Sequence, residues 1–460
     1  MGDRFMGQDE IRSRFSEAMS RMYREEVPLY GDLLEIVEAT NARVLRETPA
    51  LKADLARREE IERLDQERHG AIRLGAPAEL SMMRRALAVL GLRPVGYYDL
   101  TVAGVPVHAT AFRPTDQGSL SRNPFRIFTS LLRLELIEDL ELRAQAAALL
   151  ASRRIFSDRA VALTEQFERE GGLDAASASD FVAALLETFR WQGTARVDRA
   201  TYHQLLQVHR LVADVASFGN PHINHLTPRV LDIDAAQAEM RARGIDAKAV
   251  IEGPPRRAAP ILLRQTSFKA LEEPIRFQGK GGEAKGTHTA RFGEIEQRGI
   301  ALTRAGRALY DRLLDTARGE QGSQGSDFEH RLAAAFAVFP DDWDTLRREG
   351  LGFFHYRVVD GAAPPADDVI DLEGLIASGA VEALPIVYED FLPVSAAGIF
   401  QSNLSGGEQR AYSATAAQAA FEDALGAPVL DPFALYEATE QRSIADVAAR
   451  FPALARAQAA

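Results

Sequence analysis

The fold is decided by residues 69–113, which read HGAIRLGAPAELSMMRRALAVLGLRPVGYYDLTVAGVPVHATAFR. A short apolar segment bounded by glycines opens this stretch, which is typical of a strand. Pro77 and Gly91 then mark the start and the end of a helix. Two apolar segments follow, joined by a turn at Gly104, and one more strand is predicted beyond the quoted stretch. The predicted elements are a strand at 69–75, a helix at 77–90 and strands at 94–100, 105–113 and 125–132.

The same order of elements recurs between His225 and Lys269. Both segments begin on a histidine, and His225 follows His69 by 156 residues (225 − 69 = 156). The tetrad Thr110-Ala111-Phe112-Arg113 returns at the same offset as Thr266-Ser267-Phe268-Lys269. Two matches at one offset indicate a duplicated module. The second copy predicts strands at 222–231, 248–252, 261–269 and 289–302, and a helix capped by Asp234 that stops at Gly244.

The rest of the chain is mostly helical in pattern. Apolar residues recur every three or four positions over 8–48, and Pro28 divides this stretch into two helices. A strand at 386–392 and an alanine-rich helical tail from about 412 are also expected. The sequence therefore predicts an α+β protein. Its expected segments are helical residues 1–66, a first β module at 67–132, a helical insertion at 133–216, a second β module at 217–317 and a mixed C-terminal segment at 318–460.

Composition narrows the possible functions. The chain has 460 residues, 46% hydrophobic and 26% charged, which are ordinary values for a globular protein. The net charge of −12 argues against a nucleic-acid-binding surface, although a local basic pocket remains compatible with it. No stretch approaches the roughly 18 consecutive apolar residues of a membrane span. The expectation is a soluble, cytoplasmic protein with no nucleic-acid or membrane partner.

The chain has nine histidines and no cysteine, so thiolate metal sites are excluded. A transition-metal site must then use histidine and carboxylate, most commonly two histidines and one Asp or Glu. His69 and His225 are candidates because they occupy matched repeat positions. His222 lies three residues before His225, so on a strand it would face the opposite side, and only one of the two is expected to bind the ion.

The carboxylate candidates are Glu294 and Glu296, which face the same way if 289–302 is a strand. Spacing alone does not choose between them, and an exposed edge strand is the alternative. Arg73 shares a strand face with His69, where a guanidinium could bind a substrate carboxylate through two parallel hydrogen bonds. An ordinary surface arginine is the alternative for Arg73.

Four longer stretches carry more specific information: LDQERHGAIR at 64–73, PHINHLTPR at 221–229, FGEIEQRG at 292–299 and VYEDFLPVSAAGIF at 387–400. Together they resemble the 2-oxoadipate dioxygenase/decarboxylase family, also called hydroxyglutarate synthase, over about residues 10–450. The resemblance implies a vicinal-oxygen-chelate-like β core of duplicated βαβββ modules with extensive helical additions.

The resemblance also implies an iron(II) enzyme that converts 2-oxoadipate and O2 to D-2-hydroxyglutarate and CO2 in lysine breakdown. It implies His69, His225 and Glu294 as ligands of Fe2+. The implied substrate contacts are His69, Arg73, Val394 and Ser395, and Arg264 and Lys269 are further candidates for the distal carboxylate. Two alternatives remain open: an oxygen-independent metal-dependent isomerase or lyase on the same core, and a non-catalytic binding protein.

Overall fold

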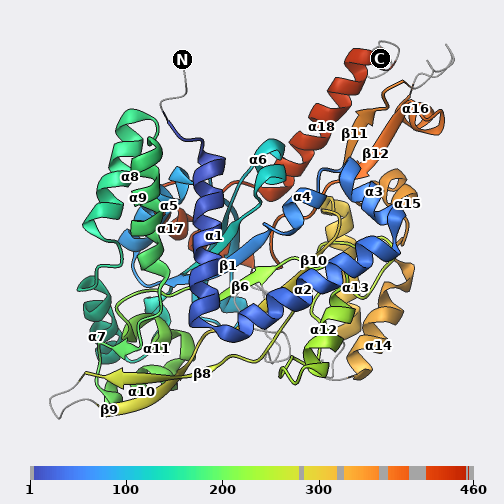
Figure 1. Ribbon diagram of the computed structural model, residues 1–460. Coiled ribbons are helices and arrows are strands. Elements are labelled where there is room, and N and C mark those ends of the chain that lie inside the picture. The colour runs from blue at the N-terminus through green and yellow to red at the C-terminus, as the bar shows by residue number, and fades with distance from the viewer. Residues whose placement is uncertain are drawn as a thin grey trace. The chain divides into compact units, whose positions relative to one another are not determined.

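The computed structural model describes residues 5–278, 284–318, 326–361, 371–392, 411–451 and 454 (Figure 1). Helices and strands alternate through these residues, which confirms the predicted α+β class. The chain forms two compact units, and neither is continuous in sequence. The first unit comprises Met1–Glu252, Gln265–Gln297 and Phe391–Leu430; the second comprises Gly253–Arg264, Arg298–Asp390 and Asp431–Ala460.

The first β module has the order βαβββ that the sequence predicted. Its strands β2, β3, β4 and β1 are neighbours in that order, and β1 runs parallel to β4. Strand β6 (His225–Pro228) continues this sheet on the free side of β1 and runs antiparallel to it. The module consists of β1 (Arg68–Leu74), α5 (Pro77–Val89), β2 (Arg93–Asp99), β3 (Val107–Arg113) and β4 (Arg126–Leu132).

The second module repeats this order less regularly. Strand β6 is followed by α12 (Ile233–Ala242), β7 (Leu263–Ser267) and β10 (Glu294–Arg298), and β7 pairs with β10. Of the strand predicted at 248–252, only an isolated bridge from Glu252 to Gln265 is present. Arg229 bridges Glu296 in parallel, which repeats the parallel pairing of β1 with β4. Arg229 also follows Arg73 by 156 residues (229 − 73 = 156), a third match at the repeat offset.

The two modules meet along β1 and β6 in a symmetric register. His69 pairs with Thr227, Gly70 with Leu226, and Ala71 with His225. Residues 156 positions apart are equivalent in the two modules. Replacing His69 and Thr227 by their equivalents gives His225 and Ala71, which is the third pair. The same replacement returns the pair of Gly70 and Leu226 unchanged. An approximate two-fold axis therefore passes between Gly70 and Leu226, and it relates His69 to His225.

Several predicted boundaries are wrong. The strand predicted at 289–302 is interrupted, because β9 (Ala284–Thr289) ends five residues before β10 begins. The missed strand β8 (Glu272–Phe277) pairs with β9 on one side and with β5 (Thr194–Ala195) on the other. Most side chains of β8 and β9 are polar, so the sequence of this segment resembles that of a loop. Asp232, rather than Asp234, caps α12, since its side chain accepts a hydrogen bond from the Ala235 amide. The strand predicted at 386–392 lies just beyond the observed β12 (Val381–Pro385).

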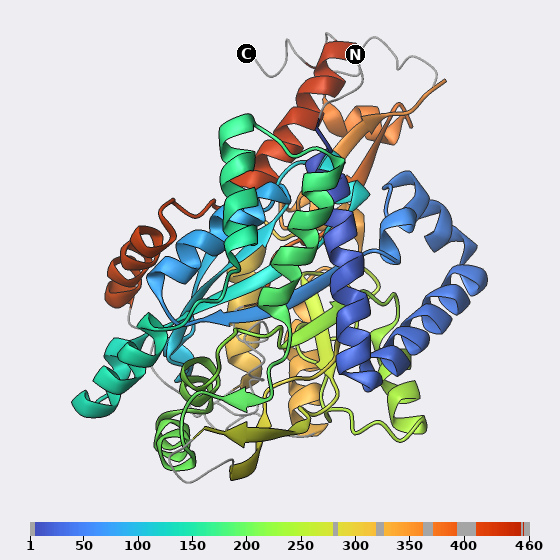
Figure 2. The ribbon, with the colours of Figure 1, turned by 60° about the vertical axis from the view of Figure 1, so that its left-hand side comes forward.

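Helices cover the sheet of the first unit. A break at Val27–Pro28 separates α1 (Gln8–Glu26) from α2 (Pro28–Glu47), as predicted. Helix α1 packs on α9 (Ala175–Leu186), beside α8 (Asp158–Glu170) (Figure 1). Helix α17 (Ala411–Leu425) packs on α5, as the turned view shows (Figure 2). The other helices here are α3 (Pro49–Arg57), α4 (Ile61–Leu64), α6 (Gln117–Arg122), α7 (Leu140–Ala151), α10 (Arg199–Val208) and α11 (Arg210–Ser217).

The second unit contains a two-stranded antiparallel sheet of β11 (Phe354–Val358) and β12, and α18 (Pro432–Arg450) packs against β11. Across the described ranges of both units, no helix has the length and apolar character needed to cross a membrane. The remaining helices of the second unit are α13 (Arg304–Arg318), α14 (Ser326–Ala335), α15 (Trp343–Arg348) and α16 (Leu372–Ala377).

Candidate metal centre and adjoining pocket

Three residues from three strands meet in the interior of the first unit. His69 lies on β1, His225 opens β6 and Glu294 opens β10. Each offers one ligand atom, and these atoms lie within 4.8 Å of one another. All three side chains are at most 1% exposed. The two-fold relation between β1 and β6 accounts for the meeting of the histidines, because it places equivalent side chains on one face of the sheet.

Most polar atoms of this cluster lack hydrogen-bond partners among the described residues. They are both ring nitrogens of His69, both ring nitrogens of His225 and Oε2 of Glu294. His69 Nε2 lies 3.3 Å from Glu294 Oε1, but the contact does not have hydrogen-bond geometry. An unsatisfied buried polar group costs about 1–3 kcal/mol. A cation would satisfy all three side chains at once, so these residues fit a bound metal ion.

Neighbouring side chains orient Glu294. Gln265 donates from Nε2 to Oε1 of Glu294 at 2.8 Å, and Thr227 donates from its hydroxyl to the same oxygen at 3.2 Å. The other carboxylate oxygen therefore remains available. The sequence did not single out Gln265 or Thr227, since an uncharged residue gains such a role only from its tertiary neighbours.

Glu296 supports His69 from behind. It is fully buried, and its Oε2 lies 3.0 Å from Nδ1 of His69. Arg126 Nη1 lies 4.0 Å from the other oxygen of Glu296. A carboxylate on the far nitrogen of a metal-binding imidazole fixes the tautomer and the orientation of the ring. This arrangement leaves Nε2 of His69 as the nitrogen that faces the cluster.

Burial and charge act differently on the two histidines. Burial alone would lower the pKa of His69, but the carboxylates of Glu296 and Glu294 outweigh burial and raise it. Burial lowers the pKa of His225 well below its usual value, and the neighbouring His69 lowers it further. Burial also raises the pKa of Glu294 against the attraction of His69. His225 is consequently neutral at physiological pH and keeps a lone pair for a metal ion.

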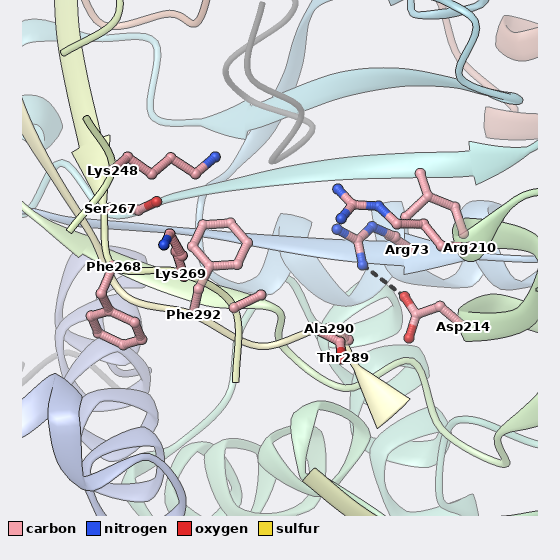
Figure 3. Close-up of a pocket in the computed structure, with 12 residues that line it drawn as sticks. Arg73, Arg210, Asp214, Lys248, Ser267, Phe268, Lys269, Thr289, Ala290 and Phe292 are labelled. Atoms are coloured by element: carbon pink, nitrogen blue, oxygen red, sulfur yellow. Dashed lines mark hydrogen bonds and ion pairs between the residues drawn. The ribbon is translucent and has the colours of Figure 1, made fainter. Parts of the chain in front are cut away.

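The first unit also contains a cavity of ≈ 170 Å³, whose lining residues are drawn in Figure 3. Phe292 lines this cavity, and its ring centroid lies 4.7 Å from that of His225. Four cationic side chains also line it, whereas Asp214 is the one acidic residue in the lining. Burial lowers the pKa of Lys248 to about 8, although Glu252 and Glu294 attract its charge. The cavity is therefore suited to an anion. Its cations are Arg73, Arg210, Lys248 and Lys269.

Arg73 reaches the cavity from the strand that carries His69. Its Nη1 donates to Oδ2 of Asp214 at 2.7 Å (Figure 3). Lys269 lines the same cavity and pairs with Asp246 at 2.8 Å. Arg264 belongs to the second unit, where its Nε donates to the carbonyl of Pro254. Two further expected substrate contacts, Val394 and Ser395, lie outside the described residues.

A second cluster, which the sequence did not reveal, lies behind Arg73. Asp214, His222 and His288 also place one polar atom each within 4.8 Å of the others, and all three are buried. His222 thus belongs to a different group from His225, in keeping with the prediction that both could not bind one ion. The segment between them is irregular rather than a strand. Asp214 gave no signal in the sequence, because it is a single acid within the apolar run of α11.

Fold and site together define a class: α+β proteins with a buried centre of two histidines and one carboxylate beside an anion pocket. Within that class, the family model described as 2-oxoadipate dioxygenase/decarboxylase matches residues 15–403. The chain belongs to this family.

Individual relatives agree with the family match. The chain is 54% identical to the 2-oxoadipate dioxygenase/decarboxylase of Pseudomonas putida over 448 residues, which cover 96% of both proteins. It is also 54% identical to the Escherichia coli protein of that name over 441 residues, 95% of this chain and 97% of the relative. The crystal structure of the Pseudomonas putida hydroxyglutarate synthase in complex with 2-oxoadipate superimposes with a TM-score of 0.90. That match is at 53% identity and covers 98% of this chain and all of the other.

Proposed function

We propose that this enzyme is an iron(II)-dependent dioxygenase that converts 2-oxoadipate and O2 to D-2-hydroxyglutarate and CO2 in lysine breakdown. The observation that carries the proposal is the buried set of unpartnered ligand atoms on His69, His225 and Glu294, near a cationic cavity whose lining residue Phe292 packs against His225. Two histidines and one carboxylate on a metal with open positions are typical of non-haem iron(II) oxygenases. The family relationship supports the choice of substrate.

In this proposal His69, His225 and Glu294 hold the iron. Bound iron(II) supplies the redox chemistry that lets O2 react with a 2-oxo acid. The protein contributes orientation: Glu296 fixes the ring of His69, and Gln265 fixes the carboxylate of Glu294. Complete burial of the three ligands keeps water from their polar atoms.

The cationic cavity would hold the substrate. 2-Oxoadipate carries a carboxylate at each end, so its recognition requires two positively charged or N–H-rich contacts. Arg73 is the first of these in our proposal, because it lies on the same strand face as His69. Arg210, Lys248 and Lys269 add positive charge around the same cavity. Val394 and Ser395, taken from the family resemblance, are proposed as further contacts.

Anaerobic reconstitution tests the proposal. Metal-free enzyme would receive iron(II) or zinc(II) under argon, followed by 2-oxoadipate and a measured amount of O2. We expect consumption of one O2 for each CO2 and each 2-hydroxyglutarate formed, with iron(II) only. Glu294→Gln, loaded in the same way, is the matched control and should consume little O2. Conversion of 2-oxoadipate to a product other than 2-hydroxyglutarate by the zinc form, without O2 uptake, would instead establish an oxygen-independent lyase or isomerase.

A further inference from the structure

We infer that Asp214 is a positioning residue for Arg73, and that the Asp214–His222–His288 cluster is a hydrogen-bond network that directs the Arg73 guanidinium into the cavity. The inference deepens the proposed function and rests on it, since that function gives Arg73 its substrate carboxylate. The cluster draws on three parts of the first unit: helix α11, the segment before β6, and strand β9.

Asp214 is bonded on both of its oxygens. Oδ2 accepts from Arg73 Nη1 at 2.7 Å, and Oδ1 lies 2.9 Å from Nε2 of His288. The other ring nitrogen of His288 lies 2.8 Å from the Tyr202 hydroxyl. His222 Nε2 lies 3.4 Å from the same Oδ1. A continuous chain of polar contacts therefore runs from Tyr202 through His288 and Asp214 to Arg73.

The direction of these hydrogen bonds follows from the charge of Asp214. Burial alone would raise the pKa of Asp214, but the surrounding histidines and Arg73 outweigh burial and hold the pKa far below its usual value. An ionised carboxylate only accepts, so Nε2 of His288 must carry a proton. The other ring nitrogen, Nδ1, is held by its 2.8 Å contact with the Tyr202 hydroxyl. Each side chain in this series of polar contacts therefore holds the next one in its orientation.

One carboxylate and two histidines could in principle bind a metal ion. The charges and hydrogen bonds around Asp214, His222 and His288 argue against this. A divalent cation on Asp214 would lie beside the guanidinium of Arg73, which already pairs with that carboxylate. A ligand nitrogen must also be unprotonated, whereas His288 donates from Nε2. Only His222 Nε2 has no hydrogen-bond partner here, in contrast to the several unpartnered atoms around Glu294. A hydrogen-bond network therefore explains more of the contacts in this cluster than a metal site does.

The bond to Asp214 uses one N–H of Arg73 and leaves the rest of the guanidinium for the cavity. Among the described residues, Arg73 makes no other hydrogen bond, and its side chain is 9% exposed. Figure 3 shows Asp214 on one side of the guanidinium, with Lys248 and Lys269 on the far side of the cavity. An arginine anchored on one edge loses less conformational freedom when its other edge binds a carboxylate.

A double-mutant cycle tests this role. Anaerobic calorimetry would measure the Kd of 2-oxoadipate for the iron-loaded parent, Asp214→Asn, Arg73→Ala and the double variant. We expect Asp214→Asn to weaken binding by about tenfold or more in the parent and by less than about twofold in the Arg73→Ala protein. Iron content should remain that of the parent. An equal loss in both backgrounds would show that Asp214 acts independently of Arg73 and would overturn the inference.

Companion variants separate positioning from folding. Tyr202→Phe removes only the hydroxyl at the far end of the chain, and we expect a smaller loss of affinity that again disappears without Arg73. Glu79→Gln is the matched control, because Glu79 is a buried carboxylate that accepts from Arg153 at 2.8 Å and lines no part of this cavity. It should leave the Kd unchanged even if the unfolding temperature falls. If Glu79→Gln weakens binding as much as Asp214→Asn, the effect is structural and the inference fails.

Two further results would be decisive. A second equivalent of metal in the parent that Asp214→Asn loses would show that the cluster is a metal site. If the parent does not bind 2-oxoadipate, the proposed function fails, and crystal structures of the parent and Asp214→Asn then decide the positioning role separately. The inference requires the Arg73 guanidinium to leave the position in Figure 3 when Asp214 is replaced. An unmoved guanidinium would refute it.

Discussion

Glu296 Oε2 lies 3.0 Å from Nδ1 of His69, while Glu294, two residues earlier on the same strand, faces Nε2 of the same ring at 3.3 Å. The two-residue spacing of a strand thus places both carboxylates around one imidazole. Their surroundings differ, since Glu294 also belongs to the cluster with His225. Strand β10 therefore places Glu294 where a metal ion could bind and Glu296 where it can orient the ring of His69.

This difference predicts unequal effects of two similar substitutions. Glu294→Gln should lose most of the bound iron, because a neutral amide replaces a charged ligand. Glu296→Gln should retain iron with an affinity lowered by about 10- to 100-fold, as expected when the support of a histidine ligand is removed. Metal analysis after dialysis against a weak chelator distinguishes the two. The opposite order of iron loss would assign the ligand to Glu296.

Arg73 should bind the substrate without holding the metal. Arg73→Ala and Arg73→Lys are expected to raise the Kd of 2-oxoadipate by about 10- to 150-fold, because a point charge cannot replace a planar pair of N–H groups. Iron content should not change. Calorimetry and metal analysis on the same preparations measure both quantities. A lysine variant with the parent's affinity would remove Arg73 from the substrate.

Gly70 should be needed for the close contact of the two modules. A Cβ added there would lie 2.7 Å from Ile223 Cδ1 and 3.1 Å from the carbonyl oxygen of His225. Gly70→Ala should therefore reduce the free energy of unfolding by about 1–3 kcal/mol and weaken iron binding through His225. Gly118→Ala is a suitable control, since its nearest contact would be an ordinary 3.5 Å. Denaturant unfolding with and without iron provides the measurement.

His108 should make the protein less stable in mild acid. It is 6% exposed and packs against the ring of Phe421, and burial lowers its pKa to about 4 from 6.5. The folded state then binds fewer protons than the unfolded state between these values. The stabilisation is complete above about pH 6.5 and is lost as the pH falls towards 4, by about 3 kcal/mol in total.

Unfolding free energies measured from pH 7 to pH 4 test this prediction. His108→Gln should show a shallower decline than the parent, because its side chain cannot take up the proton. His203→Gln, at an exposed position on α10, should decline like the parent. Identical slopes for the parent and His108→Gln would contradict the assignment.

The part of the fold that follows from local pattern was predictable. Proline and glycine mark the ends of α5, and the repeat offset places His69 and His225 at equivalent positions. The choice of Glu294 over Glu296 did not follow from spacing and came only from the family resemblance. The hairpin of β8 and β9 was missed, because its alternating polar residues do not differ from those of a loop.

The supporting residues could not be predicted, for a physical reason. Gln265 and Thr227 matter because they donate to one oxygen of Glu294, and Asp214 matters because it meets Arg73 across 141 positions of sequence. Such contacts are fixed by tertiary packing and leave no periodicity or spacing in the chain. Sequence identifies the residues whose chemistry is unusual, whereas the structure identifies those that hold them in place.

The axis between Gly70 and Leu226 has a consequence for how the two halves divide their roles. A site on such an axis takes one histidine from each half, so neither module alone supplies both. Because the two modules belong to one chain, equivalent positions away from the histidines are free to make different contacts. The equivalent arginines record this divergence: Arg73 faces the cavity, whereas Arg229 is bound to Glu60 and Glu67. Of these two equivalent positions, one thus opens onto the cavity and the other joins buried parts of the first unit to each other.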